Sequence, residues 1–387
     1  MENIEKRIGI IGGGQLGKMM IQEAKKMGFY ITVLDPTLKC PAHTLVDEHI
    51  VADFDDETAI RLLASKSDVI TYEFEHIGAD ILEQLENEGV KVYPTAKSLK
   101  IIQNKYTQKS LLFEHNIPMP EFMAVKTTDD IKNAGEKYGY PFLLKSCTGG
   151  YDGKGNFVIH SENEISEGFK TLGGGKLPLM AEKFFPFTME ISVLACRGIN
   201  GEIEVYPVAE NIHHDNILFE TRVPANISED TSKKAMALAK SVMEIFEGVG
   251  MFCVEMFVDK EGSVEVNEVA PRPHNSGHYT IEACMTSQFE QHIRAVSGLP
   301  LGSSELLKPV VMRNILGSMG YMGDAKVIGA DEALKIKGAY LHIYGKEKSV
   351  PKRKMGHLTV IANTLKEAEE KAEEAFNAVK IIGKERL

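Results

Sequence analysis

Two glutamates between Met251 and Ala270 have the spacing of a metal site. The segment reads MFCVEMFVDKEGSVEVNEVA and predicts two β-strands joined by a short loop. With a two-residue or four-residue loop, Glu255 pairs with Val266. Glu268 then pairs with Cys253, and both carboxylates lie diagonally on one face of the hairpin. Carboxylates among apolar neighbours suit Mg²⁺ shared with phosphate oxygens. A three-residue or five-residue loop would put them on opposite faces, and a water-exposed face with solvated carboxylates is the alternative.

A glycine-rich run from Thr148 to Asn156 has the composition of a phosphate-binding loop. It reads TGGYDGKGN and lies between two segments with strand patterns, YPFLLKS and FVIHS. Glycine lacks a Cβ, so the loop can turn tightly and bring backbone N–H groups to an anion. Lys145 in the first strand and Lys154 in the loop add positive charge. The run predicts a lid over a nucleoside triphosphate, with an ordinary hairpin turn as the alternative. It is not a Walker loop, because no Lys-Ser or Lys-Thr pair opens a helix after it.

Two further clusters could hold anions. APRPHNSGH, from Ala270 to His278, follows the glutamate hairpin and contains Arg272, whose guanidinium can hold a carboxylate or phosphate as a fork. Its polar neighbours are His274, Asn275 and Ser276. KRKMGHL, from Lys352 to Leu358, is a basic cluster that could hold a phosphate. A structural loop with proline-fixed turns and a solvated basic turn are the alternatives.

The N-terminal part contains two patterns that α/β proteins use for ligands. GGGQLG, from Gly12 to Gly17, stands between a strand pattern and a helix pattern, and Asp35 ends the next strand. That is the arrangement of a dinucleotide fold, in which a phosphate lies at the helix N-terminus. TYEFEH, from Thr71 to His76, places charged residues at the carboxyl end of a predicted parallel strand. A tight strand-to-helix turn and ordinary surface charge are the alternatives.

These residues need elements to position them, and the chain supplies an α/β pattern. The first hundred residues alternate strands and helices, including a helix over 15–27, and predict a parallel sheet with helices on both faces. A helical stretch follows over 96–115, and residues 121–186 read as a small lid. The rest predicts further strands, a helix over 232–247 and a charged helix over 365–380. At 387 residues, two or three domains are expected.

Composition excludes several classes of protein. A net charge of −11 argues against a nucleic-acid-binding surface. The five cysteines have no CxxC spacing, so neither a zinc site nor a disulfide framework is suggested. The sequence shows no signal peptide and no run of transmembrane length, which predicts a cytoplasmic protein without membrane partners.

Taken in their order along the chain, the motifs resemble those of ATP-grasp enzymes. They resemble more closely those of the 5-(carboxyamino)imidazole ribonucleotide synthases, the carboxylases of bacterial and fungal purine synthesis. The resemblance covers essentially the whole chain and rests chiefly on GGYDGKG and NEVAPRPHNSGH, with GGGQLG, TYEFEH and KMGHL. It implies an ATP-grasp fold with an N-terminal doubly wound domain, an ATP lid domain and a C-terminal domain. The implied segments are an N-terminal domain (1–96), a connecting helical segment of the central domain (97–123), a lid (124–186), a central domain with the metal site (187–300) and a C-terminal extension (301–387).

The resemblance also implies roles for particular residues. ATP would contact Lys105, Lys145, Gly150, Tyr151, Asp152, Gly153, Lys154, Gly155, Asn156, Glu182, Lys183, Phe184, Phe185, Glu190, His213, Asn267 and Glu268. Of these, Lys105, Lys145 and the loop 150–156 would hold the phosphates, and residues 182–185 would line the adenine. Glu190 would take the ribose hydroxyls, with His213 nearby. The aminoimidazole ribonucleotide would contact Gly14, Gln15, Leu16, Glu73, Glu75, His76, Tyr151, Arg272, His274, Asn275, Ser276, Arg353 and Lys354. Tyr151, Arg272 and Lys354 would be catalytic. Glu255 and Glu268 would hold Mg²⁺, or Mn²⁺. A homodimer is expected from the resemblance.

The implied reaction uses ATP to phosphorylate bicarbonate, a poor electrophile, to carboxyphosphate. The exocyclic amine of the ribonucleotide then takes up the carboxyl group, or CO₂ released from it, and ADP and phosphate leave. A closing lid would protect the labile intermediate from water. The competing functions are those of another ATP-grasp ligase, such as formate-dependent glycinamide ribonucleotide transformylase or biotin carboxylase. A nicotinamide-dependent oxidoreductase using GGGQLG is a rival from another class, and a catalytically dead nucleotide-binding protein is a third.

Overall fold

The N-terminal domain is a parallel sheet covered by helices on both faces. The computed structural model describes residues 6–150 and 155–386. The elements of this domain are β1 (Arg7–Ile11), α1 (Gln15–Lys26), β2 (Tyr30–Leu34), β3 (Glu48–Ile50), α2 (Glu57–Ser65), β4 (Val69–Tyr72) and α3 (Ala79–Asn87). The strand order is β3-β2-β1-β4, with all neighbours parallel. Ile8 and Ile10 pack with α1, whereas Ile70 and Tyr72 pack with α2 and α3 on the other face. The predicted doubly wound arrangement is confirmed.

Two short helices connect this domain to the rest, where one helix over 96–115 was expected. They are α4 (Ala96–Ile102) and α5 (Lys105–Glu114). The break lies at Asn104, whose side chain accepts hydrogen bonds from the backbone N–H groups of Tyr106 and Thr107. Asn104 is therefore the N-cap of α5, and Lys105 is the first residue of that helix.

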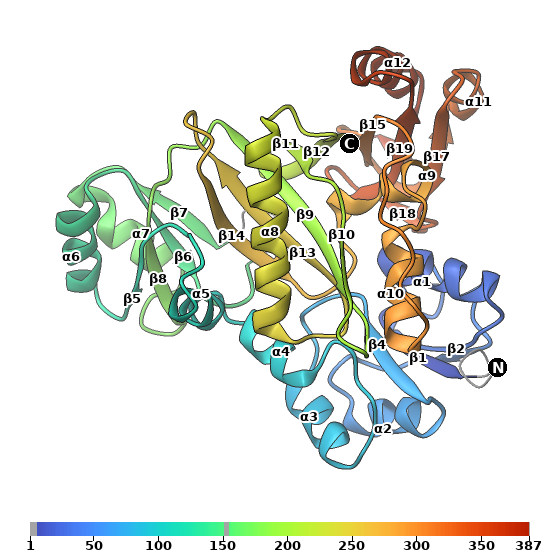
Figure 1. Cartoon of the computed structure of the whole chain (residues 1–387), viewed down its shortest axis with the longest axis horizontal. Helices are drawn as coiled ribbons and strands as arrows, with labels where there is room; N and C mark the ends of the chain where they lie inside the picture. Colours follow the sequence, from blue (N-terminus) through green and yellow to red (C-terminus); the bar gives the residue numbers. More distant parts are fainter. Residues whose placement is uncertain (1–5, 151–154, 387) are drawn as a thin grey trace.

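The lid is a small antiparallel sheet with helices on one side, seen at one end of the molecule in Figure 1. Its elements are β5 (Phe122–Val125), α6 (Thr128–Tyr138), β6 (Phe142–Ser146), β7 (Asn156–Ile159), η1 (Glu162–Glu164), α7 (Ile165–Thr171) and β8 (Leu179–Lys183). The strand order is β5-β8-β6-β7. Strands β6 and β7 pair in antiparallel fashion, so the glycine run does join two strands of a hairpin. The lid also has its own core, which includes Ile131, Phe142 and Leu144.

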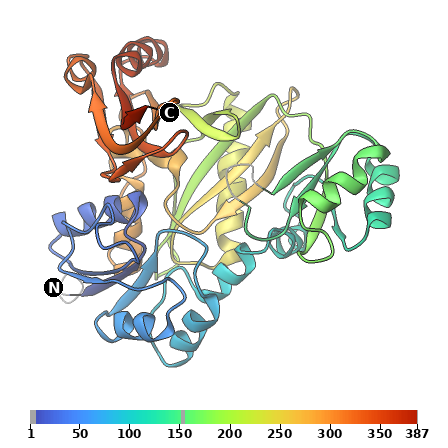
Figure 2. The same cartoon turned by 180° about the vertical axis from the view of Figure 1, so that it is seen from behind.

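The central domain is built on one large, mainly antiparallel sheet. Its elements are β9 (Met189–Arg197), β10 (Ile203–Val205), β11 (Ala209–His214), β12 (Ile217–Val223), α8 (Glu229–Phe246), β13 (Gly250–Val258), β14 (Val264–Ala270), η2 (Asn275–Gly277), α9 (Thr280–Ala283) and α10 (Gln288–Ser297). Helix α8 lies along one face of the sheet in Figure 1, while Figure 2 shows the molecule from behind. Helix α8 starts three residues before the expected 232, because Ser228 caps it.

The glutamate hairpin has a different register from the expected one. The loop between Val258 and Val264 has five residues, 259–263, which alone would put the two carboxylates on opposite faces. A β-bulge after Glu255 restores the alignment, because Asn267 is an extra residue that pairs with nothing on β13. Glu255 therefore pairs directly with Glu268, not with Val266. The predicted register is wrong, but the predicted common face is correct.

The C-terminal residues continue the central sheet. Their elements are β15 (Val310–Leu316), β16 (Tyr321–Ile328), α11 (Ala330–Leu334), β17 (Ala339–Ile343), β18 (Lys348–Ser349), β19 (Lys354–Ile361), α12 (Leu365–Ala378) and β20 (Lys380–Arg386). The large sheet runs β14-β13-β9-β11-β12-β15-β19-β17, with β10 beside β9, and a separate sheet runs β18-β16-β20. The segment limits at 96, 123, 186 and 300 stay predictions. None of the helices in residues 6–150 and 155–386 is long and apolar enough to cross a membrane.

Candidate active site

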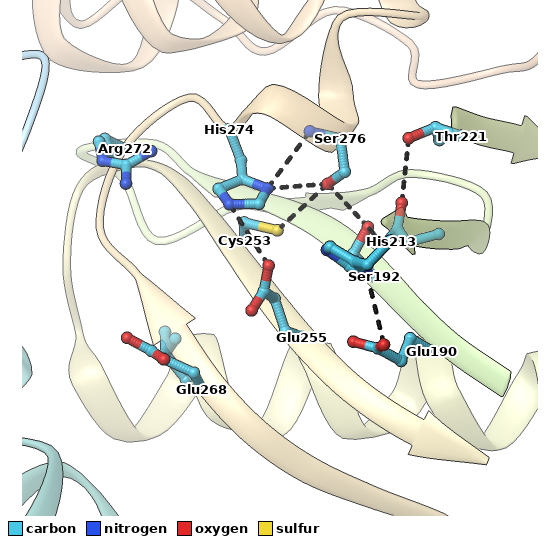
Figure 3. Close-up of polar contacts among 12 residues, drawn as sticks. Glu190, Ser192, His213, Thr221, Cys253, Glu255, Glu268, Arg272, His274 and Ser276 are labelled. Atoms are coloured by element: carbon cyan, nitrogen blue, oxygen red, sulfur yellow. Dashed lines mark hydrogen bonds and ion pairs between the residues drawn. The ribbon is translucent and has the colours of Figure 1, made fainter. Parts of the chain in front are cut away.

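Glu255 and Glu268 face each other across β13 and β14 (Figure 3). Burial, and after it the charge of Glu268, raises the pKa of Glu255 to about 7. Burial acts the same way on Glu268, but its ion pair with Lys105 outweighs burial and lowers the pKa of Glu268. One carboxylate is thus charged at neutral pH and the other is close to its titration point. Two neighbouring carboxylates repel each other, and a cation shared between them would favour the charged form of both.

Mg²⁺ fits this donor set. In the described part of the chain, no three His, Cys, Asp or Glu side chains gather closely enough to hold a metal ion. The protein ligands would therefore be Glu255 and Glu268, with phosphate oxygens and waters completing the shell. Binding through one or two carboxylates plus substrate phosphates is usual for Mg²⁺.

A buried cluster of two lysines and one glutamate lies behind this centre. Glu182 forms ion pairs with Lys145 and, at 2.7 Å, with Lys109. Burial would raise the pKa of Glu182, but the two ammonium groups outweigh it and lower the pKa to about 2. The carboxylate of Glu182 fixes Lys145, a predicted phosphate ligand, and the expectation that Glu182 lines the adenine stays a prediction. Lys109 has no motif around it, so sequence analysis missed it.

The predicted adenine-binding residues line a cavity of about 260 Å³. Lys183, Phe184 and Phe185 contribute to its wall, together with Met119 and Glu265. Glu265 was not predicted, since it is one of several alternating acidic residues on β14. Its Oε2 atom is buried and has no hydrogen-bond partner among the described residues.

Glu190, which is expected to bind the ribose, and His213, which is expected nearby, lie on neighbouring strands. Nδ1 of His213, on β11, is 3.4 Å from a carboxylate oxygen of Glu190, on β9. Burial opposes protonation of His213, but Glu190 outweighs it and raises the pKa of the imidazole. Figure 3 shows both side chains on the same sheet as Glu255.

The loop after β14 brings Arg272, His274 and Asn275 to the same region. Arg272 forms an ion pair of 2.8 Å with Glu75, so the structure joins two residues from different domains that were predicted to bind one substrate. Nε2 of His274 lies 3.4 Å from Glu255. Burial, followed by the charges of Arg272 and Lys354, lowers the pKa of His274 well below its ordinary value. Asn275 has a buried amide whose oxygen and nitrogen both lack partners among the described residues, as expected of a group that awaits a ligand.

Ser276 was predicted to contact substrate, but its side chain lies beneath the site. It is 1% exposed, and its hydroxyl contacts His274 and Ser192. Its effect on a substrate therefore passes through His274.

The glycine turn of the N-terminal domain binds carboxylates of the chain itself. The two oxygens of Glu73 accept the backbone N–H groups of Gly14, at 2.6 Å, and Gly17, at 2.7 Å. Asp35 accepts the N–H of Gly13. A Cβ atom at Gly17 would lie 2.3 Å from the backbone carbonyl oxygen of Gly12, so glycine is required there. Glu73 turns its carboxylate to these amides rather than outward, and a ligand phosphate on this turn stays a prediction.

The other residues expected near the ribonucleotide come from the N-terminal domain and from the start of β19 in the central sheet. Gln15 opens α1, and the half-buried Leu16 packs against the N-terminal core. His76 is exposed after β4. The basic cluster lies at the start of β19, where Arg353 donates to the carbonyl of Lys348 and Lys354 begins the strand.

Lys346 joins the basic cluster without having been predicted. Its Nζ donates to the carbonyl of Lys354 at 2.7 Å. Burial, followed by the charge of Arg353, lowers the pKa of Lys346 to about 8, while Glu73 opposes this. Lys346 stands outside KRKMGHL, and only the pairing of β17 with β19 brings it back to Lys354.

Part of the glycine loop lies outside the described residues. Tyr151, Asp152, Gly153 and Lys154 belong to it, and their predicted roles stay predictions. Gly155 has a φ of +95°, a conformation that favours glycine, and Asn156 pairs with Lys145 at the base of the hairpin.

Comparison with known proteins agrees with this arrangement. Three family models match: the ribonucleotide synthetase preATP-grasp domain over residues 5–103, the ATP-grasp domain over 110–289, and the phosphoribosylaminoimidazole carboxylase C-terminal domain over 310–371. The N5-carboxyaminoimidazole ribonucleotide synthase of Bacillus subtilis (strain 168) is 46% identical over 353 residues, which are 91% of this chain and 90% of that protein. This chain belongs to the N5-carboxyaminoimidazole ribonucleotide synthase family, within the ATP-grasp enzymes. The predicted fold class and family are confirmed.

Solved structures of N5-carboxyaminoimidazole ribonucleotide synthases have the same fold. The Thermotoga maritima enzyme is 48% identical, with a TM-score of 0.89, and the match covers 98% of this chain and 100% of that one. The Aspergillus clavatus enzyme, solved with ADP and 5-aminoimidazole ribonucleotide, is 36% identical, with a TM-score of 0.89 and coverages of 97% and 99%.

Proposed function

We propose that this chain carboxylates 5-aminoimidazole ribonucleotide with bicarbonate and ATP, releasing ADP and phosphate, in purine biosynthesis. The observation that carries the proposal is the juxtaposition of two sites on one sheet edge. Glu255 and Glu268 form an acidic pair for Mg²⁺, and His274 lies 3.4 Å from Glu255 on the loop that also carries Arg272. A nucleotide site and an anion site thus meet at the place where a phosphoryl group would move from one to the other.

Each group of side chains has a role in this reaction. Lys105 and Lys145 supply positive charge for the phosphates of ATP, and Glu182 and Lys109 hold Lys145 in place. Mg²⁺, when bound, neutralises charge on the phosphoryl group that moves to bicarbonate. Arg272, His274 and Asn275 bind and orient the bicarbonate and then the carboxyphosphate. The amine of the ribonucleotide forms the new C–N bond, and phosphate leaves.

The basic residues Lys346, Arg353 and Lys354 suit the phosphate of the ribonucleotide. Burial lowers the pKa of Lys346 most, and the charges of Arg353 and Lys354 lower it further, so these three cations repel one another. A phosphate dianion bound among them would remove that repulsion. Tyr151 on the glycine loop, Glu75 and His76 complete the proposed contacts. The homodimer and the cytoplasmic location stay predictions.

Omission of single substrates tests the proposal. We expect ADP to form with ATP, Mg²⁺, bicarbonate and aminoimidazole ribonucleotide together, and its rate to fall when either bicarbonate or the ribonucleotide is left out. Glu268→Gln should abolish most turnover with the fold intact, because it removes one of the two metal carboxylates. ADP formation that is indifferent to the ribonucleotide, with no carboxylated product, would overturn the assignment.

A further inference from the structure

A chain of buried polar side chains runs from the middle of the central sheet to His274 (Figure 3). Thr221 on β12 bonds Asn211 on β11 at 3.0 Å, and Asn211 bonds Ser192 on β9 at 2.9 Å. Ser192 contacts Ser276 at 2.8 Å, and Ser276 contacts Nδ1 of His274 at 2.8 Å. The first four residues are between 0% and 6% exposed, so water does not compete with these bonds. The chain therefore fixes the surroundings of one ring nitrogen.

In each of these hydrogen bonds, the donor lies on the Thr221 side and the acceptor on the His274 side. The hydroxyl of Thr221 donates to Oδ1 of Asn211, so the Nδ2 group of Asn211 donates to Ser192. Ser192 donates to Ser276, and the proton left on Ser276 points to Nδ1 of His274. Sγ of Cys253, 3.8 Å from the hydroxyl of Ser276, is its remaining polar neighbour and a weak one.

The backbone supports the same direction independently. The N–H of Ser276 also donates to Nδ1 of His274, at 3.4 Å. A backbone N–H can only donate, so this longer bond favours an unprotonated Nδ1, while the hydroxyl of Ser276, at 2.8 Å, is the closer partner. An imidazole whose Nδ1 accepts carries its proton on Nε2.

We propose that this chain of hydrogen bonds holds His274 as the Nε2–H tautomer, which makes Ser276, Ser192, Asn211 and Thr221 positioning residues for the carboxylation. The functional part of this inference rests on the proposed function, whereas the tautomer does not. In this form His274 presents a donor toward Glu255, 3.4 Å away, and toward an anionic oxygen of bicarbonate or carboxyphosphate. His274 then acts by holding the anion, and a proton acceptor for the amine must be another group.

The tautomer can be measured on the substrate-free protein. Long-range ¹H–¹⁵N NMR separates protonated from unprotonated ring nitrogens, and a His274→Gln spectrum assigns the signal among the twelve histidines. We expect an unprotonated Nδ1 and a protonated Nε2. A protonated Nδ1 in the wild-type protein would overturn the inference, whether or not the enzyme carboxylates. A wild-type protein that shows the expected tautomer but does not carboxylate the ribonucleotide would overturn only the proposed function.

One substitution should reverse the chain. Asn211→Asp offers acceptors on both sides, so Ser192 would donate to it and Ser276 would donate to Ser192. His274 would then have to donate from Nδ1. We expect the signal to shift toward the Nδ1–H tautomer and kcat to fall about tenfold or more, the usual effect of losing a residue that orients a site ligand. The KM for ATP should change little.

Two further variants keep the test decisive. If Asn211→Asp does not fold, Ser276→Ala removes the last link and should give a mixed tautomer with a similar loss of kcat. Ser98→Ala is the matched control, because Ser98 is also 1% exposed and its hydroxyl bonds the distant carbonyl of Phe246. It should leave tautomer and kcat unchanged. A folded Asn211→Asp or Ser276→Ala protein with the wild-type tautomer and kcat contradicts the inference.

Discussion

Glu255 illustrates how a residue can serve a site at a cost to the fold. Its carboxyl group is partly buried opposite Glu268, and burial with that neighbouring charge raises its pKa to about 7 from an ordinary value of 4.5. Between these two pH values the folded chain binds more protons than the unfolded chain. The contribution of Glu255 to the free energy of unfolding therefore falls as pH rises from 4.5 to 7, and stays reduced above pH 7.

Replacing this carboxyl with an amide should stabilise the protein. At pH 8 we expect the free energy of unfolding of Glu255→Gln to exceed that of the wild type by roughly 2 kcal/mol. The value allows for partial exposure of Glu255, which reduces the energetic effect of its pKa shift. The advantage should nearly disappear at pH 4.5, where the wild-type carboxyl is protonated in the folded state and about half protonated in the unfolded state. Urea unfolding at the two pH values, without nucleotide or metal, measures it.

Mg²⁺ with ATP should reverse the order of the two proteins at pH 8, because only the wild type gains the bound ion as counter-charge. Glu261→Gln, in the exposed turn of the same hairpin, is the control and should change nothing. An unchanged difference between pH 4.5 and pH 8 would contradict the electrostatic explanation.

At the residue scale, sequence analysis finds groups that stand in motifs. Sequence predicts Glu255 and Glu268 because strand residues alternate between the two faces of a sheet. It predicts Arg272 because the prolines beside it mark a loop. Lys109 and Lys346 were not predicted, because each acquires its meaning from a partner far along the chain, Glu182 or the carbonyl of Lys354. Pairings of this kind depend on tertiary structure, which local patterns do not contain.

Among the elements, strand β8 couples the lid to the phosphate site. It places Glu182 between Lys109 of α5 and Lys145 of β6, with side chains that are at most 9% exposed. Removing the carboxylate would leave two ammonium groups facing each other without water. Buried ion pairs of this kind are costly to break even where they contribute little net stability.

We expect Glu182→Gln to lower the free energy of unfolding by about 3–5 kcal/mol, as loss of one partner of a buried pair does. The control lies one strand away: Glu121 bonds Lys183 with both side chains about half exposed, at 52% and 50%. Glu121→Gln should cost about 0–1 kcal/mol. Denaturant unfolding of both variants measures these losses. Equal losses of unfolding free energy would show that the ion pairs of Glu182 are not shielded from water as described.

The elements also show where prediction from sequence reaches its limit. The hairpin of β13 and β14 was expected from its alternating pattern, but its register was not. A bulge at Asn267 adds one residue to one strand, and no composition marks it. The break at Asn104 is different, because asparagine before a helix is a recognisable cap. It was missed because the apolar pattern continues across it.

For the molecule as a whole, the C-terminal residues are part of the central sheet. Strand β15 pairs with β12, and Arg313 on β15 forms an ion pair with Glu220, which is 1% exposed on β12. A chain cut before β15 would leave β12 as an unpaired edge beside a buried carboxylate. Exposed edges of this kind promote aggregation.

Two deletions should therefore behave differently. We expect a chain ending at Lys308 to aggregate or to lack a cooperative unfolding transition. A chain without the lid, in which Pro120 is joined to Thr188 through a short glycine linker, should stay monodisperse and unfold cooperatively, because the lid has its own sheet and core. Size-exclusion chromatography and thermal unfolding compare them. A well-folded chain 1–308 would contradict the continuous-sheet interpretation.

For the whole molecule, the sequence predicts which sheets and helices each domain contains, but not how the domains are joined. Alternating strands and helices mark a doubly wound domain, and the resemblance supplied the order of domains. The pairing of β12 with β15 joins residues about ninety positions apart, for example Glu220 with Arg313. Such a contact follows from the closure of the whole fold and leaves no local pattern.

The turn formed by Gly12 to Gly17 carries its anion on the same polypeptide. Glu73 is attached to the chain and held against the amides of Gly14 and Gly17, so it cannot diffuse away. A free dinucleotide would have to displace this tethered carboxylate before its phosphate could reach the same two amides. We therefore expect nicotinamide coenzymes to compete poorly at this turn, although its sequence carries their fingerprint.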